Sequence, residues 1–306
     1  MEKKRSFTLT PIFTPFLAAI LLILLSVSGK LFSSYNDIEE NPNEFLLLIS
    51  VVQLIVFVFP CIIYYFLKGR KLNTPFLISP IKPGQIVFVI SSALLLVSGN
   101  LLIKCFYYIG LGSLPSGVDY LISDTGQLSD ANMLTVIISI ALIPAVCEEL
   151  FFRGIVLSEY KIYGTFNAVL FSAFSFAMIH FSLPSFPLYF FSGLVLGVTA
   201  AVTGSVFASA IIHFISNVLS IYISDSFLRV TIQRSGGFFA AFLSGALFLL
   251  FLVLVLSTSE GLMWKKSESG KLTELPPKSL KHISTVFFTP GFFGLVLIFV
   301  LITVLK

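Results

Sequence analysis

Charged residues are scarce in this sequence. Asp, Glu, Lys and Arg together make up 11% of its 306 residues, whereas hydrophobic residues make up 57%. A soluble globular domain carries roughly 25% charged residues, so the chain has too few charges to solvate the surface of a soluble protein. The same hydrophobic composition excludes an intrinsically disordered chain. We therefore expect an integral membrane protein.

Cysteine is also rare, and its positions show no disulfide or metal-binding pattern. Cys61, Cys105 and Cys147 each lie within an apolar run, where a free cysteine behaves as a small hydrophobic residue. The alternating pattern of a membrane β-barrel is missing as well, because runs such as 45–67 are apolar on every face. The predicted fold class is all-α, a polytopic transmembrane helix bundle.

The apolar runs are sufficient for about eight or nine helices, since about 20 apolar residues span a bilayer. The predicted helices lie near residues 9–32, 45–67, 85–110, 133–157, 162–182, 186–204, 206–224, 238–257 and 284–305. The sequence has no internal repeat and no linker long enough to suggest a soluble second domain. Residues 1–306 are therefore predicted to form a single membrane domain.

The distribution of charge predicts the orientation of this domain in the membrane. Two connectors, 37–44 and 119–130, are acidic and contain no Lys or Arg. Basic residues gather in three other segments: Lys3, Lys4 and Arg5; Lys68, Arg70 and Lys71; and Lys265, Lys266, Lys271, Lys278 and Lys281. Such clusters mark cytoplasmic segments, so we expect a multi-pass protein with a cytoplasmic N-terminus. Its expected location is a prokaryotic plasma membrane. The clusters are short and juxtamembrane, so a nucleic-acid partner is not expected.

Two adjacent glutamates close one apolar run. Glu148 and Glu149 follow the run 134–146, and Arg153 comes four residues after Glu149. On a helix this spacing places Glu149 and Arg153 on one face, with the acid on the favourable N-terminal side. Glu148 is rotated by about 100° from Glu149 and lacks this partner. One carboxylate is therefore predicted to be structural and the other free, unless both are simply solvated where the helix leaves the bilayer.

Two histidines lie in a stretch without charged residues, between Lys161 and Asp225. His180 follows an apolar run, and His213 precedes Asn217 by four residues. Each histidine could instead be a hydrogen-bonding residue between membrane helices. Alone, neither histidine predicts a function.

Their spacing relative to Glu148 is more informative. If Glu148 and His180 lie on consecutive antiparallel helices, Gly164 is the midpoint, and both residues reach the same membrane depth. His213 needs one further span to return to that level. A free carboxylate, two imidazoles and the Asn217 amide would then converge, and this combination suits hydrolysis.

Three motifs in this region resemble those of a known family. The segments are Glu148-Glu149-Leu-Phe-Phe-Arg153, Phe176-Ala-Met-Ile-His180 and His213-Phe-Ile-Ser-Asn217. In order and spacing they resemble the EExxxR, FxxxH and HxxxN/D motifs of the CPBP family. This family includes the type II CAAX prenyl endopeptidases and bacterial Abi and bacteriocin-processing or immunity proteins. The resemblance covers about 133–224, the predicted catalytic core.

The resemblance implies roles for individual residues. Glu148 would be the base that activates water, His180 and His213 would complete the water or metal site, and Asn217 would stabilise the oxyanion. A supporting group would surround them, formed by Glu149, Arg153 and Phe176.

The resemblance leaves the need for a cofactor open. His180, His213 and Glu148 match the three protein ligands of catalytic zinc sites. However, adjacent glutamates cannot share one face of a regular helix, and Glu149 is already paired with Arg153. We therefore favour a metal-free water activated by glutamate, with Zn²⁺ as the alternative.

The expected function is that of a CAAX-type intramembrane endopeptidase. Its substrate would be a membrane-associated or lipidated peptide or protein. Other intramembrane proteases fit less well, because the sequence contains no H-E-x-x-H, G-x-S-G or G-x-G-D motif. Two alternatives remain: a non-enzymatic immunity or scaffold protein of the same family, and a proton- or cation-coupled transporter. The sequence predicts neither the identity of the substrate nor the oligomeric state.

Overall fold

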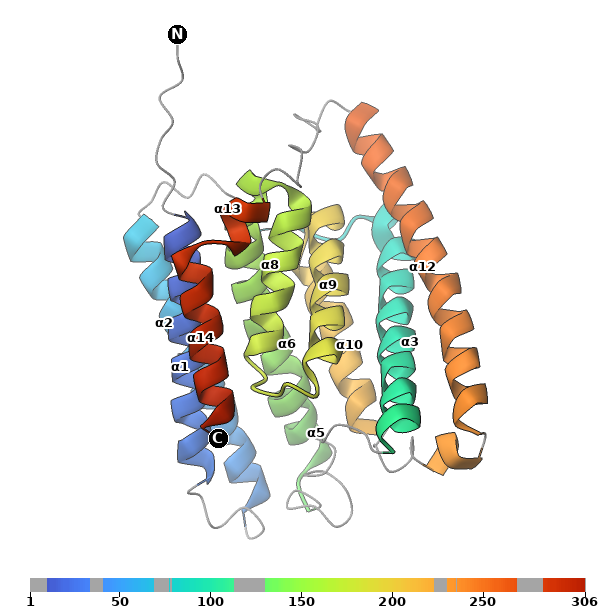
Figure 1. Ribbon diagram of the computed structural model, residues 1–306, viewed down its shortest axis with the longest axis horizontal. Coiled ribbons are helices and arrows are strands. Elements are labelled where there is room, and N and C mark those ends of the chain that lie inside the picture. The colour runs from blue at the N-terminus through green and yellow to red at the C-terminus, as the bar shows by residue number, and fades with distance from the viewer. Residues whose placement is uncertain are drawn as a thin grey trace.

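The computed structural model describes residues 10–33, 41–68, 77, 79–112, 130–222, 230–234, 236–268 and 283–305. Every regular element within these residues is a helix (Figure 1), which confirms the predicted all-α class. The longer helices are α1 (Thr10–Ser33), α2 (Pro42–Lys68), α3 (Ile86–Leu111), α8 (Thr165–Met178), α9 (Phe186–Thr203), α10 (Val206–Tyr222), α12 (Gly237–Glu268) and α14 (Pro290–Val304). Two short helices, η1 (Pro83–Gln85) and α13 (Ile283–Phe287), precede α3 and α14.

Within the residues that the structure describes, nine apolar helical segments correspond one to one to the nine predicted helices. Five are long and apolar enough to cross a membrane: Pro42–Tyr64, Pro83–Leu111, Met133–Tyr163, Phe186–Thr203 and Gly237–Trp264. Four are shorter: Thr14–Gly29, Thr165–Met178, Val206–Tyr222 and Pro290–Val304. The chain is therefore an integral membrane helix bundle. The basic and acidic connectors lie mostly outside the described residues, and the cytoplasmic N-terminus stays a prediction.

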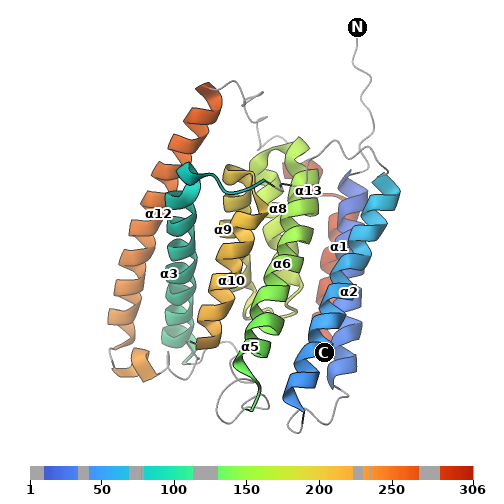
Figure 2. The ribbon, with the colours of Figure 1, turned by 180° about the vertical axis from the view of Figure 1, so that it is seen from behind.

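The helices stand side by side, roughly antiparallel, in an elongated bundle (Figures 1 and 2). At one end α1 packs against α2 and α14, and at the other end α12 packs along α3. The middle of the bundle contains the composite helix from 133 to 163 together with α8, α9 and α10. The described part of the predicted core segment, 133–222, thus occupies the centre of the bundle.

The composite helix is irregular in winding. It consists of α5 (Met133–Val136), the π-helix η2 (Ile137–Leu142), α6 (Ile143–Glu149), the π-helix η3 (Leu150–Leu157), α7 (Ser158–Tyr160) and the 3₁₀-helix η4 (Lys161–Tyr163). The first π-helix comes just before Pro144, whose missing N–H removes an α-helical hydrogen bond. Single π-helical turns inside α-helices are frequent at functional sites. Here the two π-helices lie on either side of the segment that ends at Glu149.

The next helix is shorter than predicted. A helix over 162–182 was expected, but α8 extends from Thr165 to Met178. It begins after Gly164, whose φ of 101° is accessible to glycine but rarely to other residues. His180 consequently lies in a turn beyond the helix rather than on its last regular turn. The predicted element is therefore present, with its ends three and four residues inside 162 and 182.

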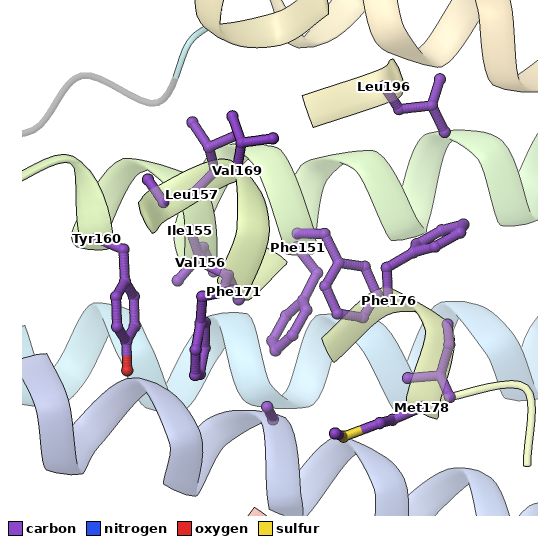
Figure 3. Close-up of a cluster of buried hydrophobic side chains, with 14 of the residues drawn as sticks. Phe151, Ile155, Val156, Leu157, Tyr160, Val169, Phe171, Phe176, Met178 and Leu196 are labelled. Carbon is purple, nitrogen blue, oxygen red and sulfur yellow. The ribbon is translucent and has the colours of Figure 1, made fainter. Parts of the chain in front are cut away.

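Aromatic and aliphatic side chains pack together in the buried core (Figure 3). Phe151 and Phe152 are completely buried and meet edge to face, and Phe152 meets Phe176 in the same way. A close backbone approach joins α8 to α9, because a Cβ atom at Gly193 would lie 2.8 Å from the Cα atom of Ala173. This approach brings the backbone of α9 within reach of side chains on the composite helix.

Candidate active site

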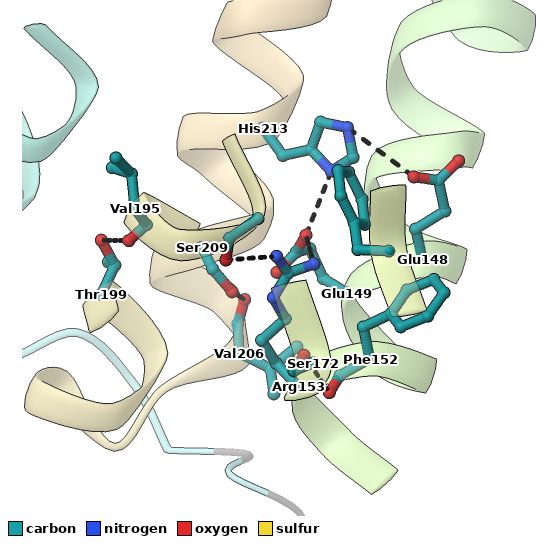
Figure 4. Close-up of polar contacts among 12 residues, drawn as sticks. Glu148, Glu149, Phe152, Arg153, Ser172, Val195, Thr199, Val206, Ser209 and His213 are labelled. Atoms are coloured by element: carbon teal, nitrogen blue, oxygen red, sulfur yellow. Dashed lines mark hydrogen bonds and ion pairs between the residues drawn. The ribbon is translucent and has the colours of Figure 1, made fainter. Parts of the chain in front are cut away.

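Four of the predicted residues meet between the composite helix and α10 (Figure 4). Glu148 and Glu149 are the last two residues of α6, Arg153 lies one turn further on in η3, and His213 projects from the middle of α10. All four are buried. The sequence motifs EExxxR and HxxxN/D are thus brought together by the contact between α6 and α10.

Glu149 and Arg153 form the pair that their spacing predicts. Nη1 of Arg153 donates to Oε1 of Glu149 at 2.6 Å, and both side chains have no exposed surface. Nη2 of the same guanidinium donates to the carbonyl oxygen of Gly193 at 3.0 Å. Its planar face lies over the ring of Phe176, 4.7 Å from the centroid. The charge is therefore held on three sides by a carboxylate, a backbone carbonyl and an aromatic face.

Glu149 has a second partner that the sequence did not reveal. Nδ1 of His213 lies 3.1 Å from the same oxygen, Oε1, that accepts from Arg153. Because this oxygen is already an acceptor, the imidazole Nδ1–H is the donor. A carboxylate that accepts from one ring nitrogen fixes the tautomer and orientation of a histidine. Glu149 therefore orients His213 so that its Nε2 atom faces away, toward Glu148.

Glu148 is the less constrained of the two glutamates. Its Oε2 atom lies 3.9 Å from Nε2 of His213, which is too long for a hydrogen bond. This oxygen has no hydrogen-bond partner among the described residues, although it is buried. Buried polar atoms are nearly always satisfied in native proteins, so an unsatisfied carboxylate beside an oriented imidazole is a candidate functional group.

His180 stands next to this group rather than within it. Its Nδ1 atom bonds to the carbonyl oxygen of Phe176 at 3.1 Å, and its ring stacks on Tyr189. The ring of Phe176 lies between the two imidazoles, with centroid distances of 5.2 Å to His180 and 5.6 Å to His213. Phe176, predicted as a supporting residue, thus contacts both histidines and Arg153.

The equal spacing of Glu148 and His180 from Gly164 does not produce a direct contact in the structure. That argument assumed two regular helices of equal rise. The π-helix η3 and the 3₁₀-helix η4 lie in one arm, and the other arm ends its regular helix at Met178. The shared membrane depth of Glu148 and His180 stays a prediction.

Asn217 lies on α10, one turn after His213. Its Nδ2 atom donates to the carbonyl oxygen of Ala141 at 3.4 Å, across the contact between α10 and η2. The side chain is partly exposed rather than buried. Its role as an oxyanion donor stays a prediction.

The three ligands of the zinc alternative are not assembled. In the part of the chain that the structure describes, no group of three or more His, Cys, Asp or Glu side chains is placed to hold a metal ion. Glu148 and His213 approach one another, but His180 is turned toward Tyr189 and the Phe176 carbonyl. The geometry therefore does not fit a site of His180, His213 and Glu148.

Two contributors to the site were missed by sequence reasoning. Gly193 supplies the carbonyl that accepts from Arg153, and Tyr189 supplies the face on which His180 stacks. Both belong to α9, which contains none of the three motifs. A glycine on an apolar helix and an aromatic near its first turn are common sequence features, so neither gave a usable signal.

The fold and the site together define a helical membrane protein with a buried carboxylate–imidazole centre. A comparison with protein families assigns this centre more specifically. Residues 130–219 match the model of the type II CAAX prenyl endopeptidase Rce1-like family. The match includes all three motifs, and it confirms the family that they predicted. Comparisons with curated proteins and with solved structures gave no significant match.

Proposed function

We propose that this protein is an intramembrane endopeptidase that hydrolyses a peptide bond with a water molecule activated by Glu148. The observation that carries the proposal is the difference between the two adjacent glutamates. Oε1 of Glu149 is bonded to both Arg153 and His213, whereas Oε2 of Glu148 faces Nε2 of His213 at 3.9 Å, too far for a hydrogen bond. The family match supports a protease at the level of the family.

In the proposed mechanism a water molecule bridges these two residues. An oxygen atom about 2.8 Å from each partner makes good hydrogen bonds, and such a position exists between two atoms 3.9 Å apart. His213 would hold the water through Nε2, since its Nδ1–H is already given to Glu149. Glu148 would be the general base, because its carboxylate oxygen is free to accept the proton.

The proposed reaction needs no further co-reactant. Glu148 takes a proton from the water as its oxygen attacks the carbonyl carbon of the scissile bond. The resulting oxyanion would be stabilised by hydrogen-bond donors, for which Asn217 is the proposed side chain. Glu148 then returns the proton to the leaving nitrogen as the C–N bond breaks. The products are a carboxylic acid and an amine, and the carboxylate of Glu148 is restored.

Arg153, Glu149 and Phe176 would act without touching the substrate. Arg153 fixes Glu149, which in turn fixes His213, while Phe176 packs between the two imidazoles. Polar groups at membrane depth must face the interior of a bundle or a water-filled space. The segment 133–224, at the centre of the bundle, is accordingly the proposed catalytic core of a single membrane domain.

The substrate is proposed to be a membrane-associated or lipidated peptide, with a CAAX-type prenylated sequence as the first candidate. This substrate class is suggested by the matched family. It can be tested with quenched fluorescent peptides presented to the purified protein in liposomes. The panel contains each CAAX peptide with and without its prenyl group, and unrelated transmembrane peptides.

Two variants make this assay specific. Glu148→Gln removes the proposed base while keeping the size of the side chain. Glu260→Gln makes the same chemical change at an exposed position on α12 and is the matched control. Cleavage by the wild type and Glu260→Gln, but not by folded Glu148→Gln, is the expected result. No cleavage of any peptide by folded wild type would reject the proposal and favour an immunity or scaffold protein.

A chelator tests whether a metal ion takes part in activating the water molecule. No step above uses a metal ion, because the predicted ligands are not assembled among the described residues. Cleavage should therefore persist in the presence of 1,10-phenanthroline. Loss of cleavage that zinc restores would contradict the metal-free mechanism.

A further inference from the structure

The position of His180 raises the question of what fixes its ring. The residue lies beyond the last regular turn of α8, in the connection to α9. Phe181, the next residue, has a φ of 47°, which is unusual for a bulky side chain. A side chain in such a turn does not receive the orientation that a helix face would give it. Contacts from elsewhere must hold the imidazole.

One contact determines which nitrogen of the His180 ring carries the hydrogen. Nδ1 of His180 lies 3.1 Å from the carbonyl oxygen of Phe176, and a carbonyl oxygen can only accept a hydrogen bond. Nδ1 therefore carries the hydrogen in this arrangement. In the neutral imidazole Nε2 is then the acceptor, available to a water molecule or to a substrate N–H group.

A second contact sets the plane of the ring. The imidazole lies flat against the ring of Tyr189, with a centroid distance of 3.5 Å and an interplanar angle of 16°. Phe176 packs against the same imidazole at a steeper angle of 60°. The hydrogen bond to Phe176 alone would still permit the ring to tilt about the bond axis. The broad face of Tyr189 removes this freedom.

The tyrosine itself is firmly placed. It lies in the first turn of α9, where its backbone N–H donates to the carbonyl of Ser185 at 3.1 Å. The connection from α8 is held by a bond from the Ser185 N–H to the Ser182 hydroxyl and by the Tyr107 hydroxyl, which donates to the Pro184 carbonyl. His180 and its stacking partner are thus fixed at the two ends of one tethered turn.

We propose that Tyr189 is a positioning residue whose ring, stacked on His180, holds the imidazole with Nε2 directed for the hydrolytic reaction. This inference rests on the proposed function and adds His180 to it through the Nε2 atom, but the placement of the ring can be tested without any cleavage. Phe176 belongs to the motif; Tyr189 lies outside all three motifs. Substitutions at Tyr189 therefore test a contact that the motif residues do not include.

The sequence offers a simple spectroscopic test. It contains three histidines, at positions 180, 213 and 282, so selective ¹⁵N-histidine labelling gives few signals. Solid-state NMR of the wild type in liposomes, assigned with His180→Gln, should show His180 with the hydrogen on Nδ1. Tyr189→Phe keeps an aromatic ring and should leave this signal in place. Tyr189→Leu should broaden it or shift it toward a mixture of tautomers.

The matched control is Phe190→Leu, the same loss of an aromatic ring at the neighbouring position of α9. Phe190 packs against Phe174 and Phe186 and makes no ring contact with His180. The His180 signal should be unchanged in this variant. An unchanged signal in Tyr189→Leu, or an equal change in Phe190→Leu, would overturn the proposal. Should Tyr189→Leu fail to fold, Tyr189→Met fills more of the space and makes the same comparison.

Kinetics then connect the ring to the reaction. Misplacement of a catalytic group by about 1 Å can reduce the rate roughly 100-fold, so Tyr189→Leu should lower kcat by about tenfold or more with little change in KM. Tyr189→Phe should restore kcat to within about twofold. If Tyr189→Leu changed the NMR signal but left kcat unaltered, Tyr189 would position the His180 ring without any effect on catalysis. That result would reject the claim that the stacking contact serves the reaction. A wild type without any activity would instead reject the proposed function.

Discussion

Arg153→Met should destabilise the protein strongly. The substitution removes the ion-pair partner of buried Glu149, which keeps its hydrogen bond to His213, and it removes one donor to the Gly193 carbonyl. Breaking a buried ion pair by removing one partner costs about 3–5 kcal/mol. The Gly193 carbonyl loses only its second donor, because it lies inside α9 and belongs to the hydrogen-bond ladder of that helix, so the expected loss comes mainly from the broken ion pair. Activity should fall as well, because Glu149 would no longer hold His213.

A double-mutant cycle tests the pair itself. Glu149→Gln with Arg153→Met removes both charges, so no buried charge is left without its partner. The double variant should therefore be less destabilised than the sum of the two single variants, by about 0.5–3 kcal/mol. Glu148→Gln is the internal control: its Oε2 atom has no hydrogen-bond partner among the described residues, and its effect should stay within about 1 kcal/mol.

Reversible unfolding in mixed detergent micelles with increasing dodecyl sulfate can measure all four variants. The substitutions at the two adjacent glutamates should differ in their effect on the free energy of unfolding: Glu149→Gln should lower it, and Glu148→Gln should leave it nearly unchanged. Additive effects in the cycle would refute the inference that Glu149 and Arg153 act as a buried pair. Equal folded yield of Arg153→Met and wild type, with activity lost, would show that Arg153 acts in the chemistry instead.

Two further predictions concern packing and a buried hydrogen bond. Gly193→Ala should lower the free energy of unfolding by about 1–3 kcal/mol, because its new Cβ atom would lie 2.8 Å from the Cα atom of Ala173. Gly294→Ala is the control, because its Cβ atom meets nothing within 4 Å and should leave stability unchanged or slightly raised. Equal thermal stability of both variants in detergent would contradict this prediction. Tyr64→Phe should lower the free energy of unfolding by about 1–3 kcal/mol, because the tyrosine hydroxyl donates to the buried carboxylate of Glu159 at 2.6 Å. An unchanged unfolding midpoint would show that this hydrogen bond does not contribute to stability.

The helices of the bundle were predictable because the bilayer leaves little choice. Backbone polar groups in a membrane must be satisfied within each segment, so long apolar runs without charges become helices. The pairing of Glu149 with Arg153 was predictable for a similar reason, since it depends only on spacing within one helix. Local geometry, in both cases, is set by neighbouring residues along the chain.

The geometry between helices was not predictable from spacing. His213 bonds to Glu149 and faces Glu148 because α10 crosses α6 at that level, and no periodicity in the sequence encodes such a crossing. His180 was expected on a regular helix, but α8 ends at Met178 and the ring is held by Tyr189. Motif order indicated which residues belong to the site, and tertiary packing determined which of them touch.

The winding of the composite helix was also outside the reach of the sequence. The π-helices η2 and η3 have no apolar periodicity that distinguishes them from α-helix, and only Pro144 offers a local cause for the first. The close approach at Gly193 likewise depends on two helices at once.

The most direct test of the account is the single-turnover cleavage rate of folded Glu148→Gln, relative to wild type, on the peptide that the wild type cleaves best in liposomes. A general base typically contributes about 10²–10⁴-fold to the rate, so the rate should fall by at least about 100-fold while the unfolding midpoint is retained. A rate within about tenfold of wild type would contradict the assignment of Glu148 as the base that activates water.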